Sequence, residues 1–215
     1  MSLDAWIIFA LFWIVFVTTP GPNAVNCITN GMRLGFRRAL PGVAAILCQA
    51  ALFLTLSALG ITALIASSPE AFRALQLMGA GFLIYLGIRT WRGARIARTP
   101  ARVEERLRLR PRPGSVFWPA FAIATINPKS VAGYLAAFSQ FVQPGVPIWD
   151  QMSVIAPTAL TLTALSYMGF TALGAGLGRA ALGAVFNVWL RRGLGACFIL
   201  YGALLGSASV SMARS

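Results

Sequence analysis

Long apolar stretches separated by short polar or charged segments make up most of the chain. Several of these stretches approach or exceed the about 20 apolar residues that a helix needs to cross a bilayer. The pattern predicts six membrane-spanning segments, at 3–30, 42–66, 71–91, 115–142, 148–176 and 193–211. The first and fourth are long because each contains a break. We therefore expect an all-α integral membrane protein.

The first break is the stretch TTPGPNAVNCITNG, residues 18–31, which follows the apolar run LDAWIIFALFWIVFV. A second break, INPKS, lies inside the fourth segment. In each break a residue suited to the cap position precedes a proline suited to the first helical position, as Gly21 precedes Pro22 and Asn127 precedes Pro128. Both breaks therefore predict the start of a half-helix within a span. A plain proline kink, common in membrane helices, is the alternative.

The two halves of the chain resemble each other in sequence. GAGFLIY (79–85) and GACFILY (195–201) share the pattern G-A-x-F-x-x-Y, and TPGPN (19–23) aligns with TINPK (125–129). Because each half holds three spans, the halves are expected to insert with opposite orientation, as inverted repeats do in many secondary transporters. The alternative is chance similarity between segments rich in Gly, Ala and Phe. The expected units are a first repeat at 1–91, a basic link at 92–114 and a second repeat at 115–215.

Opposite insertion makes the two half-helix starts face each other near the middle of the membrane. A helix N-terminus offers free N–H groups and about half a positive charge, so two of them suit a carboxylate. Gln49 and Asn23 are weaker candidates, because polar side chains also hold membrane helices together. The predicted substrate-binding residues are Pro20, Gly21, Pro22, Asn23, Asn127, Pro128, Lys129 and Gln49.

Lys129 is the only lysine in the chain and, tyrosines aside, the only ionisable residue deep in a span. Placing it there costs about 2.5–3.5 kcal/mol on insertion scales. A residue this costly is expected to face a cavity and to bind an anionic group. The alternative is a structural lysine that caps the carbonyls of a neighbouring half-helix.

The charge of the chain is strongly asymmetric about the predicted spans. The net charge is +13, and fifteen arginines fall in the links after spans one, three and five, against Arg73 and Arg214 on the other side. The positive-inside rule then predicts that these links are cytoplasmic and that both termini lie outside. In the basic link from Arg89 to Arg112, which is expected to lie along anionic lipid headgroups, six arginines recur at helical spacing: Arg89, Arg92, Arg95, Arg98, Arg102 and Arg106. Because the charges sit between spans, a nucleic-acid partner is not expected.

The residue types that enzymes and metal sites require are missing or badly placed. The chain has no histidine, its three cysteines form no CxxC pair, and its five acidic residues fall at span ends or in links. These features exclude a serine–histidine protease and argue against an aspartyl mechanism or a metal site. We expect a protein that is not an enzyme, with no cofactor. The GxxxG segments 174–178 and 202–206 are expected to be helix-packing faces, which also permit a homo-oligomer.

Four stretches, taken in order with the six spans, resemble the LysE/RhtB-type amino-acid exporters of the lysine exporter family. They are TPGPN, GMRLGFRRALPGVAA, GAGFLIYLGIR and NPKSVAGYLAAFSQFV. The resemblance implies export of an amino acid or a derivative from the bacterial cytoplasm across the inner membrane, driven by an ion gradient. It places Pro20, Gly21, Pro22, Asn23, Asn127, Pro128 and Lys129 in the matching motifs.

The sequence departs from that family in the residues available for proton coupling. The family often has an acidic residue or a histidine in span two, whereas the nearest polar residue in this chain is Gln49. With no carboxylate or imidazole in the spans, Lys129 itself is the candidate for a part in proton coupling. A passive channel or facilitator for another small anionic or zwitterionic solute is the alternative function.

Overall fold

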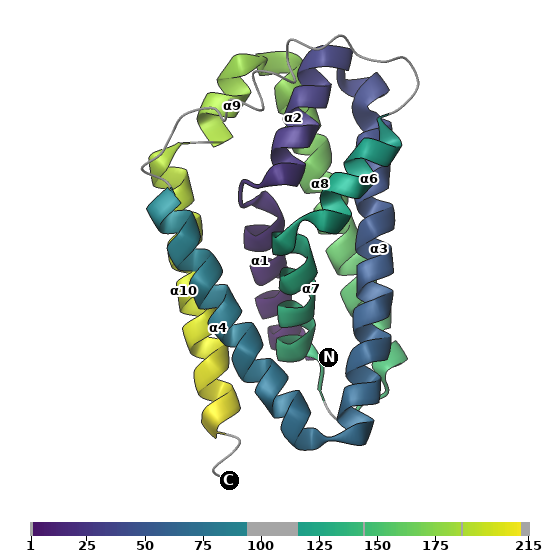
Figure 1. The fold of residues 1–215 in the computed structure, drawn as a ribbon, viewed down its shortest axis with the longest axis vertical. Helices are drawn as coiled ribbons and strands as arrows, with labels where there is room; N and C mark the ends of the chain where they lie inside the picture. Colours follow the sequence, from purple (N-terminus) through teal and green to yellow (C-terminus); the bar gives the residue numbers. More distant parts are fainter. Residues whose placement is uncertain (1, 94–115, 144, 186, 212–215) are drawn as a thin grey trace.

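The structure is a computed structural model that describes residues 2–93, 116–143, 145–185 and 187–211, and all the regular elements in these ranges are α-helices. The helices are α1 (Leu3–Thr18), α2 (Pro22–Leu34), α3 (Phe36–Ser67), α4 (Pro69–Gly93), α6 (Phe117–Ile126), α7 (Pro128–Phe141), α8 (Ile148–Leu177), α9 (Arg179–Val185) and α10 (Val188–Ser211). They form an elongated bundle in which α1–α2, α4 and α8 run in one direction and α3, α6–α7 and α10 run in the other (Figure 1).

In the part of the chain that the structure describes, four helices are each long and apolar enough to cross a membrane: α3, α4, α8 and α10. The pair α1 and α2, bent by 58° at its break, makes a fifth span if it is taken as one. The expectation of an all-helical membrane protein is met, since many large apolar side chains, such as Leu165 and Leu200, point outward. The expected count of six is not reached, because Asn127 divides segment 115–142 into helices of 10 and 14 residues.

Several predicted boundaries were wrong near the arginines. α3 begins at Phe36 directly after Gly35, whose φ of 74° turns the chain back from α2, so Arg37 and Arg38 belong to the first turn of α3. α10 begins at Val188, which makes Arg191 and Arg192 helical, and the short helix α9 was not expected. Arginine is tolerated at the end of a membrane helix because its long side chain reaches the interface. The arginine stripe beyond Gly93 lies outside the described residues.

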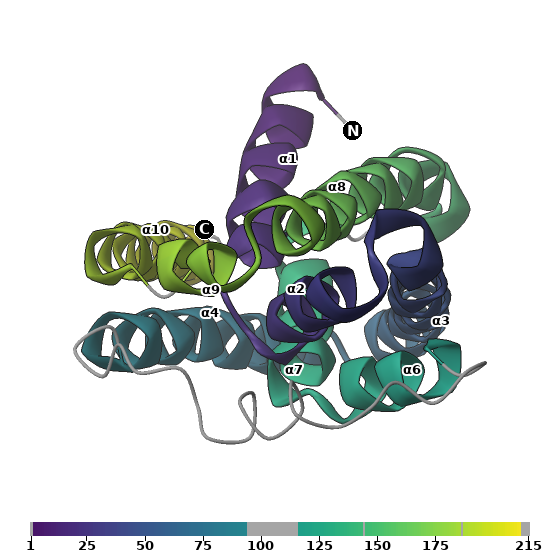
Figure 2. The same cartoon turned by 90° about the horizontal axis from the view of Figure 1, so that it is seen from above.

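Two apolar cores hold the helices together. The larger one contains the aromatic face of α1, where the ring centre of Phe12 lies 5.5 Å from that of Phe141 of α7 in a tilted arrangement and 6.4 Å from that of Phe198 of α10 in an edge-to-face arrangement. The smaller one joins α2, α3, α6, α8 and α9. Seen from above, α1 leans out of the bundle between α8 and α10, while α4 and α10 form a pair on one side (Figure 2).

Glycines bring two helix pairs into close contact. A Cβ on Gly195 of α10 would lie 2.8 Å from the carbonyl oxygen of Gly87 of α4, and a Cβ on Gly87 would lie 2.7 Å from that of Gly195. Gly174 of α8 and Gly31 of α2 meet the backbone of the opposite helix in the same way. Close backbone approach of this kind is a main source of stability between membrane helices. Gly174 therefore packs within the chain, as does Gly202 against α4.

Candidate functional site

Buried polar residues separate the two apolar cores at one level of the bundle. Along α3, Gln49 lies between Ile46 of the smaller core and Ala50 of the larger. The chain also passes from one apolar core to the other at both helix breaks and along α8. The buried polar residues at these changes of core are Thr19, Asn23, Gln49, Asn127, Ser130 and Thr163. Because buried polar groups in a membrane are costly, a layer of them indicates a functional level of the protein.

Each break begins a helix as its sequence predicts. Gly21 is the N-cap of α2 and Pro22 occupies the first turn, while Asn127 is the N-cap of α7 and Pro128 the first residue. The side-chain oxygen of Asn127 accepts a hydrogen bond of 3.1 Å from the backbone N–H of Lys129. Both helices start at mid-height, and from there α2 runs toward one end of the molecule and α7 toward the other (Figure 1). The positive ends of two helix dipoles therefore lie in the same region.

The side chain of Lys129 joins the two breaks. Its ammonium donates a hydrogen bond of 2.7 Å to the carbonyl oxygen of Thr19, the C-cap of α1, and lies 5.0 Å from the centre of the Phe16 ring. This contact matches the structural alternative, in which the lysine caps a neighbouring half-helix. Lys129 also lines a pocket between the breaks. Lys129 thus both caps the end of α1 and lines the pocket.

The pocket has a volume of about 410 Å³ and lies between the two breaks, α4 and α10. Its lining includes six of the eight predicted residues, namely Pro20, Gly21, Pro22, Asn127, Pro128 and Lys129. Gly21 and Lys129 are neighbours there, since a Cβ on Gly21 would lie 3.6 Å from Cδ of Lys129. The structure therefore brings together the two breaks that the sequence separates by about a hundred residues.

Asn23 and Gln49 do not line this pocket. Gln49 is 1% exposed, and neither its amide nitrogen nor its amide oxygen has a hydrogen-bond partner among the described residues. Asn23 is buried in α2 beside Tyr167. These two residues belong to the buried polar layer and lie outside the pocket lining.

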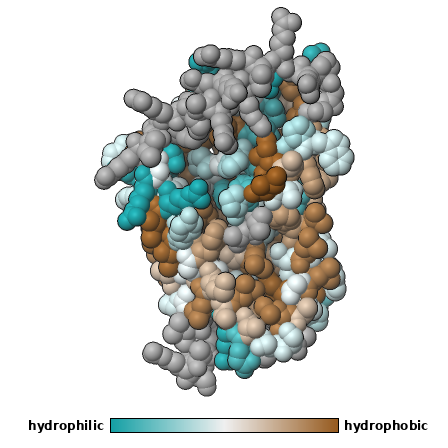
Figure 3. Space-filling model, viewed as in Figure 1, coloured by the Kyte–Doolittle hydropathy of each residue, from teal (hydrophilic) through white to brown (hydrophobic). Residues whose placement is uncertain are grey.

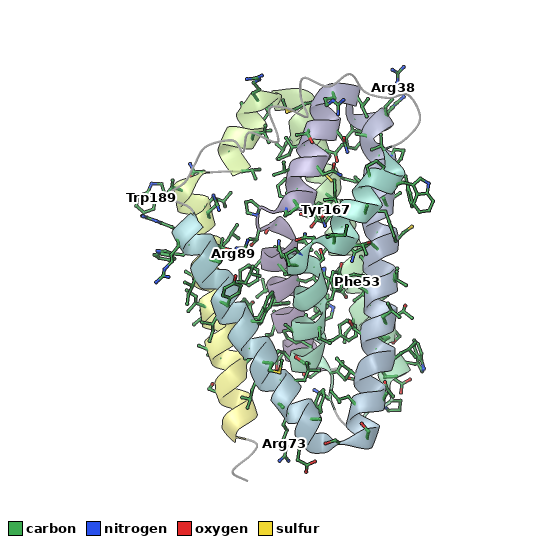
Figure 4. All side chains as sticks on the ribbon, in the orientation of Figure 1. Arg38, Phe53, Arg73, Arg89, Tyr167 and Trp189 are labelled. Atoms are coloured by element: carbon green, nitrogen blue, oxygen red, sulfur yellow. The ribbon has the colours of Figure 1, made fainter. Side chains whose placement is uncertain are left out.

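Sequence reasoning missed the wall of the pocket that α4 and α10 provide. It contains Phe82, Tyr85, Arg89 and Thr90 of α4 and Arg191 of α10. Arg89 was expected to lie on lipid headgroups and Arg191 to lie in a cytoplasmic link, so neither was expected in the pocket. Figure 4 shows Arg89 well between Arg38 and Arg73, which mark opposite ends of the bundle. The spacing of Phe82, Leu86, Arg89 and Gly93 along one helix face is the signal that could have found this wall.

The described lining of the pocket is positively charged and contains no acidic residue. Arg89, Arg191 and Lys129 supply three cations, and the starts of α2 and α7 add partial positive charge. No group of His, Cys, Asp or Glu that could hold a metal ion occurs among the residues that were described. The chemistry of the pocket is that of binding an anionic group.

The chain is similar in sequence to bacterial membrane proteins and efflux proteins. The chain is 32% identical over 208 residues to an uncharacterized membrane protein of Vibrio cholerae, with 97% of this chain and 99% of the relative covered. It is 29% identical over 210 residues to the homoserine/homoserine lactone efflux protein of Salmonella typhimurium, with 97% and 98% covered. It is 25% identical over 160 residues to the leucine efflux protein of Salmonella choleraesuis, with 74% of each chain covered. No solved structure matches the chain.

The family model of the LysE type translocators matches residues 14–209, which include both breaks, the α4–α10 pair and every residue that lines the pocket. This chain therefore belongs to the LysE type translocator family.

Proposed function

We propose that the protein exports an amino acid or an amino-acid derivative from the bacterial cytoplasm across the inner membrane, and that the pocket between the breaks is its substrate site. The observation that carries this proposal is the meeting of two half-helix starts and three basic side chains around one pocket of about 410 Å³. The efflux proteins among the relatives support an amino-acid substrate. Of the substrate-binding residues proposed from the sequence, Pro20, Gly21, Pro22, Asn127, Pro128 and Lys129 line this pocket, and Asn23 and Gln49 are proposed to act from the buried polar layer outside its lining.

The proposed architecture has six spans in two inverted halves, residues 1–91 and 115–215. In this arrangement α6 and α7 together form the fourth span, broken at Asn127 as the first span is broken at Gly21. The opposite directions of α1–α2 and α6–α7, of α3 and α8, and of α4 and α10 support it (Figure 1). Inverted halves with discontinuous helices around a central site are a common plan of secondary transporters.

The orientation proposed from the arginines places both termini outside the cytoplasm. This proposal assigns Arg38 to the cytoplasmic side and Arg73 to the outer side. The structure supports the assignment to different sides, because Arg38 and Arg73 lie at opposite ends of the bundle (Figure 4). Reporter fusions at Thr99 and Gly145 test it, since Thr99 is expected in the cytoplasm and Gly145 outside. The reverse result would overturn the orientation. The link 92–114 is proposed to lie on anionic lipids. A homo-oligomer is also proposed, formed through helix faces that no other helix of the same chain covers.

Transport is proposed to be coupled to the proton gradient. Lys129, which is half-buried in the pocket lining, is the candidate for a proton-carrying group, because no described lining residue is acidic. A Lys129→Gln protein that still accumulated substrate against its gradient in response to pH would exclude that role. The second candidate function is a passive channel or facilitator for another small anionic or zwitterionic solute, which would move that solute at a rate that no imposed pH gradient changes.

The test of the proposed function is uptake of labelled amino acids into inverted membrane vesicles that contain the protein. A pH gradient is imposed or omitted, and vesicles with Lys129→Ala serve as the comparison. Gradient-dependent uptake of a few amino acids that Lys129→Ala abolishes is the expected result. Absence of uptake for every amino acid in the panel would refute the proposal.

A further inference from the structure

We infer that the pocket recognises the carboxylate of its solute and leaves the amino group unrecognised, so that N-acylated amino acids are accepted while amides, lactones and cationic amino acids are rejected. This inference rests on the proposed function and deepens it, because it names the chemical class that the exporter selects. It concerns a wall of the pocket, on α4 and α10, that the half-helix starts do not provide.

Two arginines face the half-helix starts across the pocket. Arg89 is exposed near the end of α4, and Arg191 is half-buried in the first turn of α10, where its guanidinium lies close to Gly93. The α4–α10 pair that carries them is held by the close approach of Gly87 and Gly195. The two arginines are therefore carried on one closely packed pair of helices. Guanidinium groups bind carboxylates in a bidentate manner, which makes them well suited to this group.

The described lining offers no negative charge for the ammonium of an amino acid. None of its residues is acidic. The carbonyl end of a broken helix is the other place where a membrane transporter binds cations. At the first break the carbonyl end of α1 already binds a cation, because the ammonium of Lys129 donates a hydrogen bond to the carbonyl oxygen of Thr19 and lies over the Phe16 ring. The protein thus supplies its own ammonium where a zwitterionic solute would place one.

The charge of the pocket then decides among solutes. A free ammonium on the solute would lie near three basic side chains and two helix N-termini, which repel it, whereas acylation removes that charge. Converting the carboxylate into an amide or a lactone removes the group that the arginines bind. On the face shown in Figure 3, hydrophilic residues gather over the upper ends of α4 and α10, and apolar residues cover much of the lower part. A negatively charged solute would therefore find its binding groups at these upper ends.

The test measures ligand binding by the purified, full-length protein in detergent, as a rise in unfolding temperature with solute concentration. The probes are L-leucine, N-acetyl-L-leucine, L-leucinamide, L-homoserine, L-homoserine lactone and L-lysine. The variants are Arg89→Gln and Arg191→Gln. Their matched controls are Arg92→Gln, on the same helix end, and Arg192→Gln, whose side chain stacks on Trp189; neither arginine lines the pocket.

We expect N-acetyl-L-leucine to bind at least as tightly as L-leucine, and leucinamide, the lactone and lysine to bind at least about tenfold more weakly. Arg89→Gln and Arg191→Gln should each weaken carboxylate binding about tenfold or more, while both controls leave it unchanged. The unfolding temperature without ligand shows whether a variant is folded.

The outcomes separate this inference from the proposed function. Equal binding of leucine and leucinamide, or carboxylate binding that survives in both pocket variants, would overturn the inference and leave amino-acid export standing. Binding of none of the six probes would overturn both. Competition by added phosphatidylglycerol that depends on Arg89 and Arg191 would show that lipid anions occupy the two arginines, and it would also overturn the inference.

Discussion

The ammonium group of Lys129, in the first turn of α7, donates a hydrogen bond of 2.7 Å to the carbonyl oxygen of Thr19, at the end of α1. A cation is unfavourable in the first turn of its own helix but favourable at the C-terminal end of another. The long side chain of lysine achieves both positions, since it starts in α7 and ends at α1. This one contact ties the second break to the first and places a positive charge beside the pocket.

Replacing Lys129 with methionine is expected to loosen the junction of the breaks. The carbonyl of Thr19 would lose a hydrogen bond to a charged donor, which contributes about 1.5–3 kcal/mol. We expect Lys129→Met to lower the unfolding temperature in detergent and to abolish transport, with Lys129→Arg intermediate in stability. An unfolding temperature equal to that of the unmodified protein would contradict the structural part of this role.

Asn127 offers a way to separate helix capping from substrate binding. Its side-chain oxygen caps α7 by accepting from the N–H of Lys129, so Asn127→Ala should cost about 1 kcal/mol of stability. Asn127→Asp keeps a good cap but brings a negative charge to the pocket lining. We expect the aspartate variant to unfold like the unmodified protein and to bind substrate about tenfold more weakly. Undiminished uptake by Asn127→Asp would show that no anionic group binds there.

The contact between α4 and α10 is expected to depend on Gly195 and not on its neighbour Gly193. A Cβ on Gly195 would lie 2.8 Å from the Gly87 carbonyl oxygen, whereas nothing lies within 4 Å of a Cβ on Gly193. Gly195→Ala should destabilise the protein by about 1–3 kcal/mol, as overpacking does, while Gly193→Ala should be neutral or stabilising. Thermal unfolding of the two variants side by side provides the measurement. A similar effect of both substitutions would rule out the close backbone contact.

Gln49 is expected to be retained for function at a cost in stability. Both polar atoms of its buried side chain are without hydrogen-bond partners among the described residues, and an unsatisfied buried polar group costs about 1–3 kcal/mol. Gln49→Met should therefore keep or raise the unfolding temperature and reduce transport. A variant that transported normally would remove Gln49 from the proposed site, and one that unfolded easily would show a structural role instead.

Much of the fold follows from the sequence, because local rules decide it. Apolar stretches predict the helices, and proline with its cap residue predicts where α2 and α7 begin. The boundaries of α3 and α10 were wrong because charge was taken to end a span, whereas Arg37, Arg38, Arg191 and Arg192 continue helices beyond the apolar stretches. The 58° bend between α1 and α2 depends on packing and has no local signal beyond its prolines and glycine.

The site could be predicted in part for the same reason. The two breaks and Lys129 carry rare residue types in a membrane span, so they were found without knowing their neighbours. Arg89 and Arg191 are two of many arginines, and only tertiary packing of α4 on α10 beside the breaks distinguishes them. The bond from Lys129 to Thr19 joins residues 110 positions apart, and the sequence left it open whether this lysine binds substrate or caps a helix.

The central claim is that substrate occupies the pocket between the breaks, and protection of an introduced thiol tests it most directly. Tyr85 lines the pocket and is 55% exposed, whereas Arg92 is exposed on the same helix outside the pocket. Tyr85→Cys and Arg92→Cys are made in a chain in which Cys27, Cys48 and Cys197 are replaced, and reaction with a water-soluble maleimide is timed with and without the transported amino acid. The account predicts that substrate slows the reaction of Tyr85→Cys and leaves that of Arg92→Cys unchanged. Equal rates with and without substrate at Tyr85→Cys, in a variant that still transports, would contradict it.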